Sequence, residues 1–321
     1  MDKKEEGIII DWIKNSSKEK FEIELASSDA SFRTYYRINF KSGSKIVMYA
    51  PPDKEPLTDF INITKKLKDE KISVPEIFDI NEEKGLMLIS DFGTERYLDK
   101  LNDETVYCLY TDAIDVIHIM QERVSTDNME YFDLHKQHDE LNLFIEWYLR
   151  KHLKISEDTI RDYKFYECCD TLLNQIQKIP TSFIHRDYHS RNLMHMNNGN
   201  PGVLDYQDAQ IGPITYDLVS LLKDCYISWD QKIIDSMIKT FYQRNSTNNV
   251  SLDEFEYWFD ITGLQRHLKA IGIFSRLFYR DGKENYLNDI PRTQKYVNEV
   301  LNKYTELKDM KETFHKLGLD N

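Results

Sequence analysis

Two aspartates and an asparagine stand at a spacing that suits phosphoryl transfer. Asp187 and Asn192 lie five residues apart in the segment HRDYHSRN (185–192), and Asp205 follows the apolar pair Val203-Leu204. In a site of this kind one carboxylate takes the proton of an acceptor hydroxyl, while an amide oxygen and a second carboxylate hold Mg²⁺ on phosphate groups. The full combination is rarer than a polar turn that happens to contain an aspartate. We therefore interpret it as a magnesium-dependent catalytic site.

The elements that must position these residues begin with a small sheet. Thr34–Phe40 and Lys45–Ala50 are rich in β-branched and aromatic residues and predict a hairpin. Ile77–Ile80 and Leu86–Ile89 predict a second pair of strands. Helices are expected beside these strands over residues 8–16 and 57–70.

The remainder of the chain is predicted to be mainly helical. Apolar residues recur at three- and four-residue spacing from Val106 to Met120, which indicates one buried helix face. Strand-like runs return only between Phe183 and Tyr206, with a hairpin turn at 197–202. Together these patterns predict an α+β fold with two lobes, a small mixed β-sheet lobe over residues 1–91 and a larger, mainly helical lobe over 92–321. Further helices are expected over 139–153, 157–177, 214–226, 230–245, 252–280 and 291–316.

Composition excludes several classes of partner. The chain of 321 residues carries 42 basic and 55 acidic residues, and its net charge of −13 would repel a nucleic-acid backbone. No stretch reaches the roughly 18 apolar residues of a membrane span, and the N-terminal apolar run is too short for a signal peptide. The four cysteines show no metal-binding spacing, so we expect reduced thiols in a cytoplasmic protein. The oligomeric state is left open.

The catalytic segment also carries a family resemblance. HRDYH at 185–189, with Asn192, resembles the aminoglycoside phosphotransferase and choline kinase superfamily, whose members have a protein-kinase-like two-lobed fold. Longer segments are similar to the bacterial anomeric kinases of N-acetylmuramate and N-acetylglucosamine. These segments, which extend from residue 28 to about 292, include SDASFR (28–33), LDYQDA (204–209), GPITYDLVS (212–220) and QRHLKAIGIFSR (265–276).

The resemblance implies a role for each matching residue on the nucleotide side. Asp187 would be the catalytic base, Asn192 and Asp205 would bind Mg²⁺, and ATP would be the phosphoryl donor. The segment SDFG at 90–93 imitates a metal-binding kinase motif but precedes the catalytic loop, so we expect the backbone of Ile89 and Asp91 to pair with adenine. The strand at 46–50 lacks the lysine that usually contacts the phosphates, and Arg33 or Lys45 could replace it. The loop expected to cover the phosphates contains Ser28, Asp29, Ala30, Ser31, Phe32 and Arg33.

The acceptor site is predicted from charged and polar residues. Arg266 and Lys269 lie three residues apart on one helix face, so one of them could bind a carboxylate. Asp217 is expected to hold the loop structure, and His189 either braces the loop or fills the core. The expected acceptor is a small-molecule amino sugar, phosphorylated at its anomeric hydroxyl in cell-wall recycling. A kinase for an aminoglycoside, choline or another sugar, and a non-catalytic nucleotide-binding homologue, are the alternatives. The candidate acceptor residues are His189, Gln207, Asp208, Asp224, Arg266, His267 and Lys269.

Overall fold

The computed structural model describes residues 3–28, 32–244 and 250–320. The chain divides into two compact units, the first formed by Met1–Arg96 with Leu193–Asp208 and the second by Tyr97–Asn192 with Ala209–Asn321. The predicted lobes, 1–91 and 92–321, differ from this division mainly at residues 193–208. That segment joins the first unit because its backbone bonds there: His195 N donates to Glu95 O (2.7 Å) and Val203 N donates to Ser73 O (2.7 Å).

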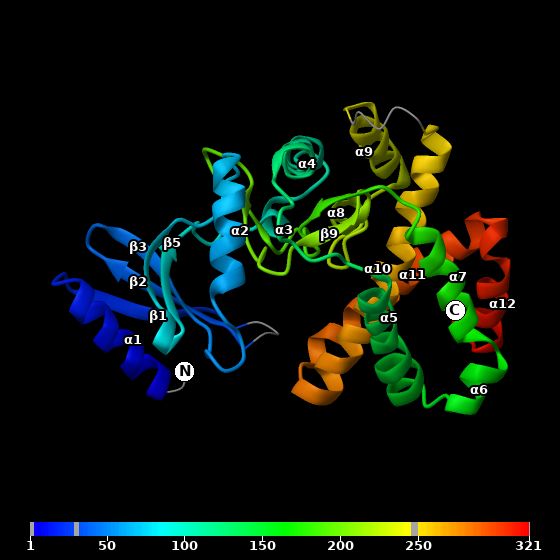
Figure 1. Ribbon diagram of the computed structural model, residues 1–321, viewed down its shortest axis with the longest axis horizontal. Coiled ribbons are helices and arrows are strands. Elements are labelled where there is room, and N and C mark those ends of the chain that lie inside the picture. Colours follow the sequence, from blue (N-terminus) through cyan, green and yellow to red (C-terminus); the bar gives the residue numbers. More distant parts are fainter. Residues whose placement is uncertain (1–2, 29–31, 245–249, 321) are drawn as a thin grey trace. The chain divides into compact units, whose positions relative to one another are not determined.

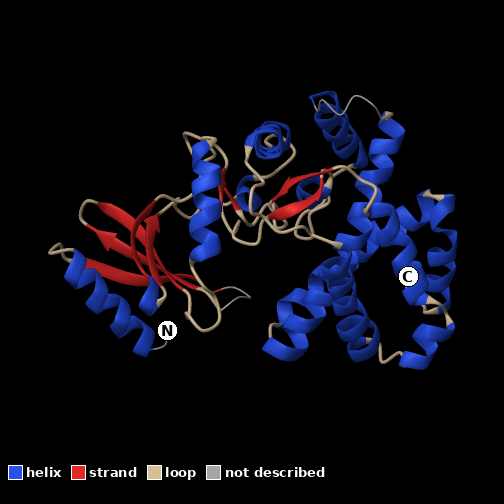
Figure 2. Ribbon diagram, viewed as in Figure 1, coloured by secondary structure: helices blue, strands red, loops and turns tan. Residues whose placement is uncertain are grey.

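The first unit is built on a five-stranded sheet (Figures 1 and 2). Its order is β1-β2-β3-β5-β4, and every neighbouring pair is antiparallel. The two predicted hairpins are present, and the N-terminal strand β1, which was not predicted, extends the sheet beyond them. The elements of this unit are α1 (Lys3–Ser16), β1 (Phe21–Ser28), β2 (Thr34–Phe40), β3 (Gly43–Tyr49), α2 (Thr58–Asp69), β4 (Ile77–Asn81), β5 (Leu86–Ser90), β7 (Leu193–Met194) and β8 (Gly202–Val203).

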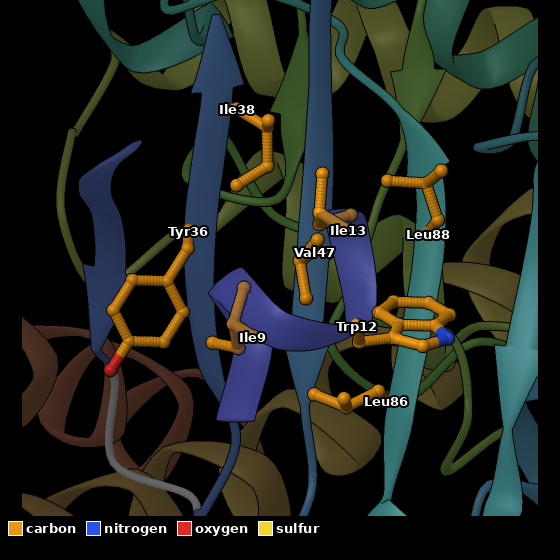
Figure 3. Packing of buried hydrophobic residues seen from close by; sticks show 8 residues of the cluster. All are labelled: Ile9, Trp12, Ile13, Tyr36, Ile38, Val47, Leu86 and Leu88. Carbon is orange, nitrogen blue, oxygen red and sulfur yellow. The ribbon is translucent and has the colours of Figure 1, made fainter. Parts of the chain in front are cut away.

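Helix α1 covers part of this sheet through a continuous apolar contact (Figure 3). Three of its side chains, Ile9, Trp12 and Ile13, follow helical spacing and therefore share one face. They pack against alternate residues of β2, Tyr36 and Ile38, which strand geometry places on one side of the sheet. The cluster is completed by Val47, Leu86 and Leu88. Burial of each such side chain contributes about 1.5–3 kcal/mol.

Among its described residues, the second unit is helical apart from one short pair of strands, β6 (Thr181–Ile184) and β9 (Gln210–Pro213), which run antiparallel (Figure 2). Most predicted helices are present, but two of them are divided: the one over 157–177 at Tyr163 and Lys164, whose φ is 58°, and the last one at Tyr304. None of the helices in the described ranges combines the length and the apolar character that a membrane crossing requires. The helices are α3 (Tyr97–Lys100), α4 (Val106–Arg123), α5 (Leu134–Leu143), a π-helical stretch (Phe144–His152), α6 (Glu157–Asp162), α7 (Phe165–Ile176), α8 (Tyr216–Leu222), α9 (Gln231–Arg244), α10 (Leu252–Asp281), α11 (Ile290–Lys303) and α12 (Lys308–Lys316).

Helix α10 organises this unit because it contacts α5, α7, α8, α9 and α11. It begins at the N-cap Ser251, whose hydroxyl accepts from Glu254 N, and it ends at Gly282, whose φ of 67° suits glycine. At Gly272 a Cβ atom would lie 2.4 Å from the backbone of Leu143, so only glycine lets α10 approach the end of α5 this closely. This close packing brings polar residues of α10 against α5.

Candidate active site

The predicted catalytic loop, residues 185–192, leaves strand β6 and has an ordered internal structure. Asn192 Nδ2 donates to the carbonyl of Asp187 (3.0 Å), and Asn192 N donates to the carbonyl of His189 (2.9 Å). These bonds close the part of the loop from Asp187 to Asn192 on itself. Arg186 has a φ of 75°, a left-handed conformation that a non-glycine residue adopts only where its surroundings impose it.

Two fully buried carboxylates supply that constraint. Asp217 accepts from the backbone N–H groups of His185 (2.7 Å) and Arg186 (3.0 Å). Asp224 accepts from Ser190 N (2.9 Å) with one oxygen and from Tyr226 N (2.8 Å) with the other. The loop is therefore held on both sides of Asp187. Asp217 has the loop-holding position expected for it, whereas Asp224, a candidate for sugar binding, has both oxygens committed to backbone amides.

The charge of Asp187 is set by cations around it. Burial alone would raise the pKa of this carboxyl, but the positive charge of Lys269 and, more weakly, those of Arg186 and Arg266 hold its pKa well below its usual value. Asp187 is consequently a carboxylate at neutral pH. In that form it can accept the proton of an acceptor hydroxyl.

Glu140 of α5, which sequence reasoning missed, anchors two of those cations. Its Oε1 lies 2.5 Å from Arg186 Nη2 and 3.2 Å from Lys269 Nζ, and its Oε2 accepts from Gln265 Nε2 (2.9 Å). Burial would raise the pKa of Glu140, but Lys269 and Arg186 lower it below its ordinary value. Lys269 is therefore already paired within the chain, although it was predicted to bind the acceptor.

The two histidines predicted near the acceptor have different surroundings. The ring of His189 packs edge-on against Tyr226, with centroids 5.3 Å apart, and burial lowers its pKa to about 4, so it is neutral at pH 7. His267 is fully buried, stacks on Tyr296 and has Nε2 2.9 Å from the carbonyl of Lys223. His267 thus belongs to the core of the second unit, which makes acceptor binding by its side chain implausible.

The first unit carries the second predicted metal ligand, Asp205. This residue follows β8, is exposed, and has a φ of 63°. Gln207 Nε2 donates to Asp205 Oδ1 (2.9 Å) and also lies 3.3 Å from Asp208 Oδ2. The two candidate sugar-binding residues, Gln207 and Asp208, are therefore close to the predicted metal ligand Asp205. Tyr206 anchors the segment by packing on Phe60 of α2, with ring centroids 4.9 Å apart.

The loop expected to cover the phosphates is described only at its edges. Asp29, Ala30 and Ser31 lie outside the described residues, and Ser28 ends β1. Phe32 is 59% exposed, and its backbone N donates to Glu55 Oε1 (3.2 Å). No nucleotide-binding role for this loop follows from these contacts alone, and the role stays a prediction.

Arg33 and Lys45, the two candidates to replace the missing lysine, have different surroundings. Arg33 is 9% exposed and pairs with Glu55 at 2.7 Å. Both Arg33 and Asp205 act electrostatically on Tyr35, so the pair lies near the candidate metal ligand. Lys45 instead lies over the ring of Phe78, 3.9 Å from its centroid. A cation held by a glutamate is the arrangement that kinases use at the phosphates, and Arg33 fits it better than Lys45 does.

The segment at 90–93 has a structural use for its aspartate. Asp91 accepts from Arg37 Nε (2.6 Å), Arg37 Nη2 (3.1 Å) and Gly93 N (2.8 Å). Burial would raise the pKa of Asp91, but the bonds from Arg37 lower it. This carboxylate is therefore engaged by Arg37. Ile89 lies inside β5, opposite Ile46 of β3 and Ile77 of β4, whereas Asp91 lies just beyond the end of the strand. Pairing of these two residues with adenine stays a prediction.

These features define a phosphotransferase of the kinase-like class, and comparison with known proteins agrees. Residues 22–255 match the phosphotransferase enzyme family (APH), and the chain belongs to that family. Structures with the same fold include the ADP-bound aminoglycoside phosphotransferase APH(2″)-Ib (TM-score 0.60, 15% identity, 94% of this chain and 99% of that one). The choline kinase LicA from Streptococcus pneumoniae also matches (TM-score 0.66, 11% identity, 92% and 99%). The predicted kinase-like fold and family are thereby confirmed.

Closer relatives are found among sugar kinases. The chain is 37% identical over 299 residues to the N-acetylmuramate/N-acetylglucosamine kinase of Pseudomonas putida, covering 92% of this chain and 88% of the relative. It is 35% identical over 307 residues to the protein of the same name from Neisseria meningitidis, covering 92% and 91%. The resemblance predicted from the motifs is confirmed, and the chain is an enzyme of this phosphotransferase family.

Proposed function

We propose that this chain transfers the γ-phosphoryl group of ATP to the anomeric hydroxyl of N-acetylmuramate and N-acetylglucosamine, as a cytoplasmic step in cell-wall recycling. The observation that carries the proposal is the identity of 35–37% to kinases of that name over 92% of the chain. The ordered loop around Asp187 supplies the base that such a transfer requires.

Asp187 has a charge state that suits this acceptor. The anomeric hydroxyl belongs to a hemiacetal and is more acidic than the other hydroxyls of the sugar, so it gives up its proton to a carboxylate more readily than they do. In our proposal Asp217 and Asp224 hold the loop that orients this carboxylate, and Lys269 keeps it ionised. Positioning of this kind accounts for much of the catalysis of phosphoryl transfer.

For the nucleotide, the chain offers residues that can bind Mg²⁺ and phosphate. Asn192 and Asp205 each offer an oxygen of the type that Mg²⁺ prefers, and in the described ranges no three His, Cys, Asp or Glu side chains gather as a ready-made metal site. Phosphate and water oxygens would supply the remaining ligands, and the bound ion would neutralise charge on the phosphates. Arg33, held by Glu55, would add a cation there.

An acceptor screen with phosphorus NMR of the products tests the proposal. Free N-acetylglucosamine and N-acetylmuramate should give 1-phosphates that are labile to mild acid and no longer reducing. The methyl glycoside of N-acetylglucosamine should not react, because its anomeric oxygen carries no proton. Phosphorylation of the glycoside at the same rate as the free sugar would contradict the anomeric assignment. Turnover only with an aminoglycoside or choline would identify another acceptor, and no turnover with any of them would indicate a non-catalytic homologue.

A further inference from the structure

Arg266 of α10 is a buried cation without a carboxylate of its own. The residue is 5% exposed, and its Nε is buried and has no hydrogen-bond partner. Its Nη1 lies 3.9 Å from Cys225 Sγ, a weak acceptor. Within the described ranges no Asp or Glu oxygen lies within 4.0 Å of a nitrogen of Arg266, the distance that defines an ion pair. Burial alone disfavours a guanidinium; electrostatic interaction with nearby groups, among them Asp187 and Asp224, nevertheless raises the pKa of Arg266, although no carboxylate is bonded to it directly.

The neighbouring buried lysines contrast with Arg266. Lys269, one turn further along α10, lies 3.2 Å from Glu140, and Lys223 lies 3.0 Å from Asp260. Each of these cations is therefore compensated by an acid of the chain. Because Lys269 is already used in this way, the carboxylate-binding role that the sequence left open between Arg266 and Lys269 falls to Arg266.

Arg266 lies near Asp187, the residue proposed to act on the acceptor. Its electrostatic neighbours are Cys225, Tyr216, Asp187 and Asp224. Asp224 is bound to backbone amides and Asp187 is the proposed base, so neither is a dedicated partner for the guanidinium. An anion bound by Arg266 would thus lie near Asp187, the residue that takes the proton of the acceptor's hydroxyl.

We propose that Arg266 binds the lactyl carboxylate of N-acetylmuramate and so favours the acidic sugar over N-acetylglucosamine. This inference rests on the proposed function. A carboxylate offers two oxygens to the planar fork of a guanidinium, which no neutral hydroxyl can match. N-acetylglucosamine lacks the lactyl group and would leave Arg266 without its anion.

The test compares kcat/KM for the two sugars in the wild-type enzyme and in Arg266→Met. The ratio of N-acetylmuramate to N-acetylglucosamine should fall by about 10- to 100-fold, as expected for loss of a charge-assisted hydrogen bond. Arg276→Met is the control, because Arg276 lies on the same helix and its electrostatic neighbours are Arg280 and Asp281. In that variant the ratio should stay at the wild-type value.

A second measurement does not depend on the folding of the variant. The wild-type enzyme should use the neutral methyl ester of N-acetylmuramate less well than the acid, by a similar factor. An unchanged ratio in Arg266→Met, with both sugars impaired equally, would assign Arg266 to the phosphoryl group or the loop and overturn the proposal. Equal use of ester and acid would also overturn it. Absence of phosphorylation of either sugar by the wild-type enzyme would instead refute the proposed function itself.

Discussion

Replacement of Glu140 by glutamine should destabilise the second unit strongly. Glutamine keeps the shape of the side chain and one acceptor oxygen, but it removes the negative charge that Arg186 and Lys269 share at 2.5 and 3.2 Å. Both buried cations would then lose the acid that pairs with them directly. Breaking a buried ion pair by removing one partner costs about 3–5 kcal/mol. We expect a loss of stability in that range, together with a fall in kcat because both cations act on Asp187.

The matched control is Glu146→Gln, in the π-helical stretch that follows α5. Glu146 pairs with Arg150 at 2.6 Å, a comparable distance, but its side chain is 53% exposed. An exposed pair of this kind contributes about 0–1 kcal/mol. Urea unfolding followed by tryptophan fluorescence can separate the two variants, because Trp147, Trp229 and Trp258 all belong to the second unit.

The effect of Glu140→Gln should also depend on pH. Since the pKa of Glu140 is lowered in the folded protein, its stabilisation is complete above the unfolded pKa, about 4.3, and is lost as pH falls through the folded value. The difference between wild type and variant should therefore shrink as the solution is acidified below that unfolded value. A loss below about 1 kcal/mol at pH 7, equal to that of Glu146→Gln, would refute the view that Glu140 anchors this cluster.

Four further substitutions, of which Lys45→Ala is a control, test the nucleotide and catalytic roles. Asp187→Asn should lower kcat by about 10²–10⁴-fold while nucleotide binding, measured by calorimetry, persists; near-normal turnover would exclude Asp187 as the base. Asp205→Ala should weaken magnesium-dependent ATP binding as well as rate, and an unchanged affinity for Mg-ATP would show that Asp205 is not a ligand. Arg33→Ala should raise the KM for ATP more than Lys45→Ala does, because Arg33 is held by Glu55 whereas Lys45 lies over Phe78; the reverse order would move the role to the strand.

The catalytic loop could be proposed from the sequence because its chemistry is local. Asp187 and Asn192 lie within one short segment, and their spacing survives any arrangement of the helices around them. Strand β1 was missed although Phe21 and Ile23 alternate with Glu22 and Glu24, a period of two that could have revealed it. The alternation is short, however, and ends close to the expected phosphate loop, so it is a weak signal on its own.

The residues on the acceptor side were harder to predict because their ion pairs join segments that are far apart in the sequence. A glutamate in a helix such as α5 resembles a solvated surface residue, and nothing near Glu140 in the sequence indicates that it meets Lys269 of α10. Helical spacing placed Arg266 and Lys269 on one face, but which of them is compensated depends on that distant contact. The same limit applies to Asp224, whose partners are backbone amides that carry no sequence signal.

The discontinuous first unit has a consequence for biosynthesis. A nascent chain that has emerged only as far as Arg96 contains the whole five-stranded sheet but lacks β7, β8 and Tyr206. The backbone of Ser73 would then have no Val203 to bond, and Phe60 would lose its aromatic neighbour. We expect this lobe to stay sensitive to proteolysis on the ribosome until about residue 208 has cleared the exit tunnel. The segment that carries Asp205 would thus be the last piece to complete the lobe.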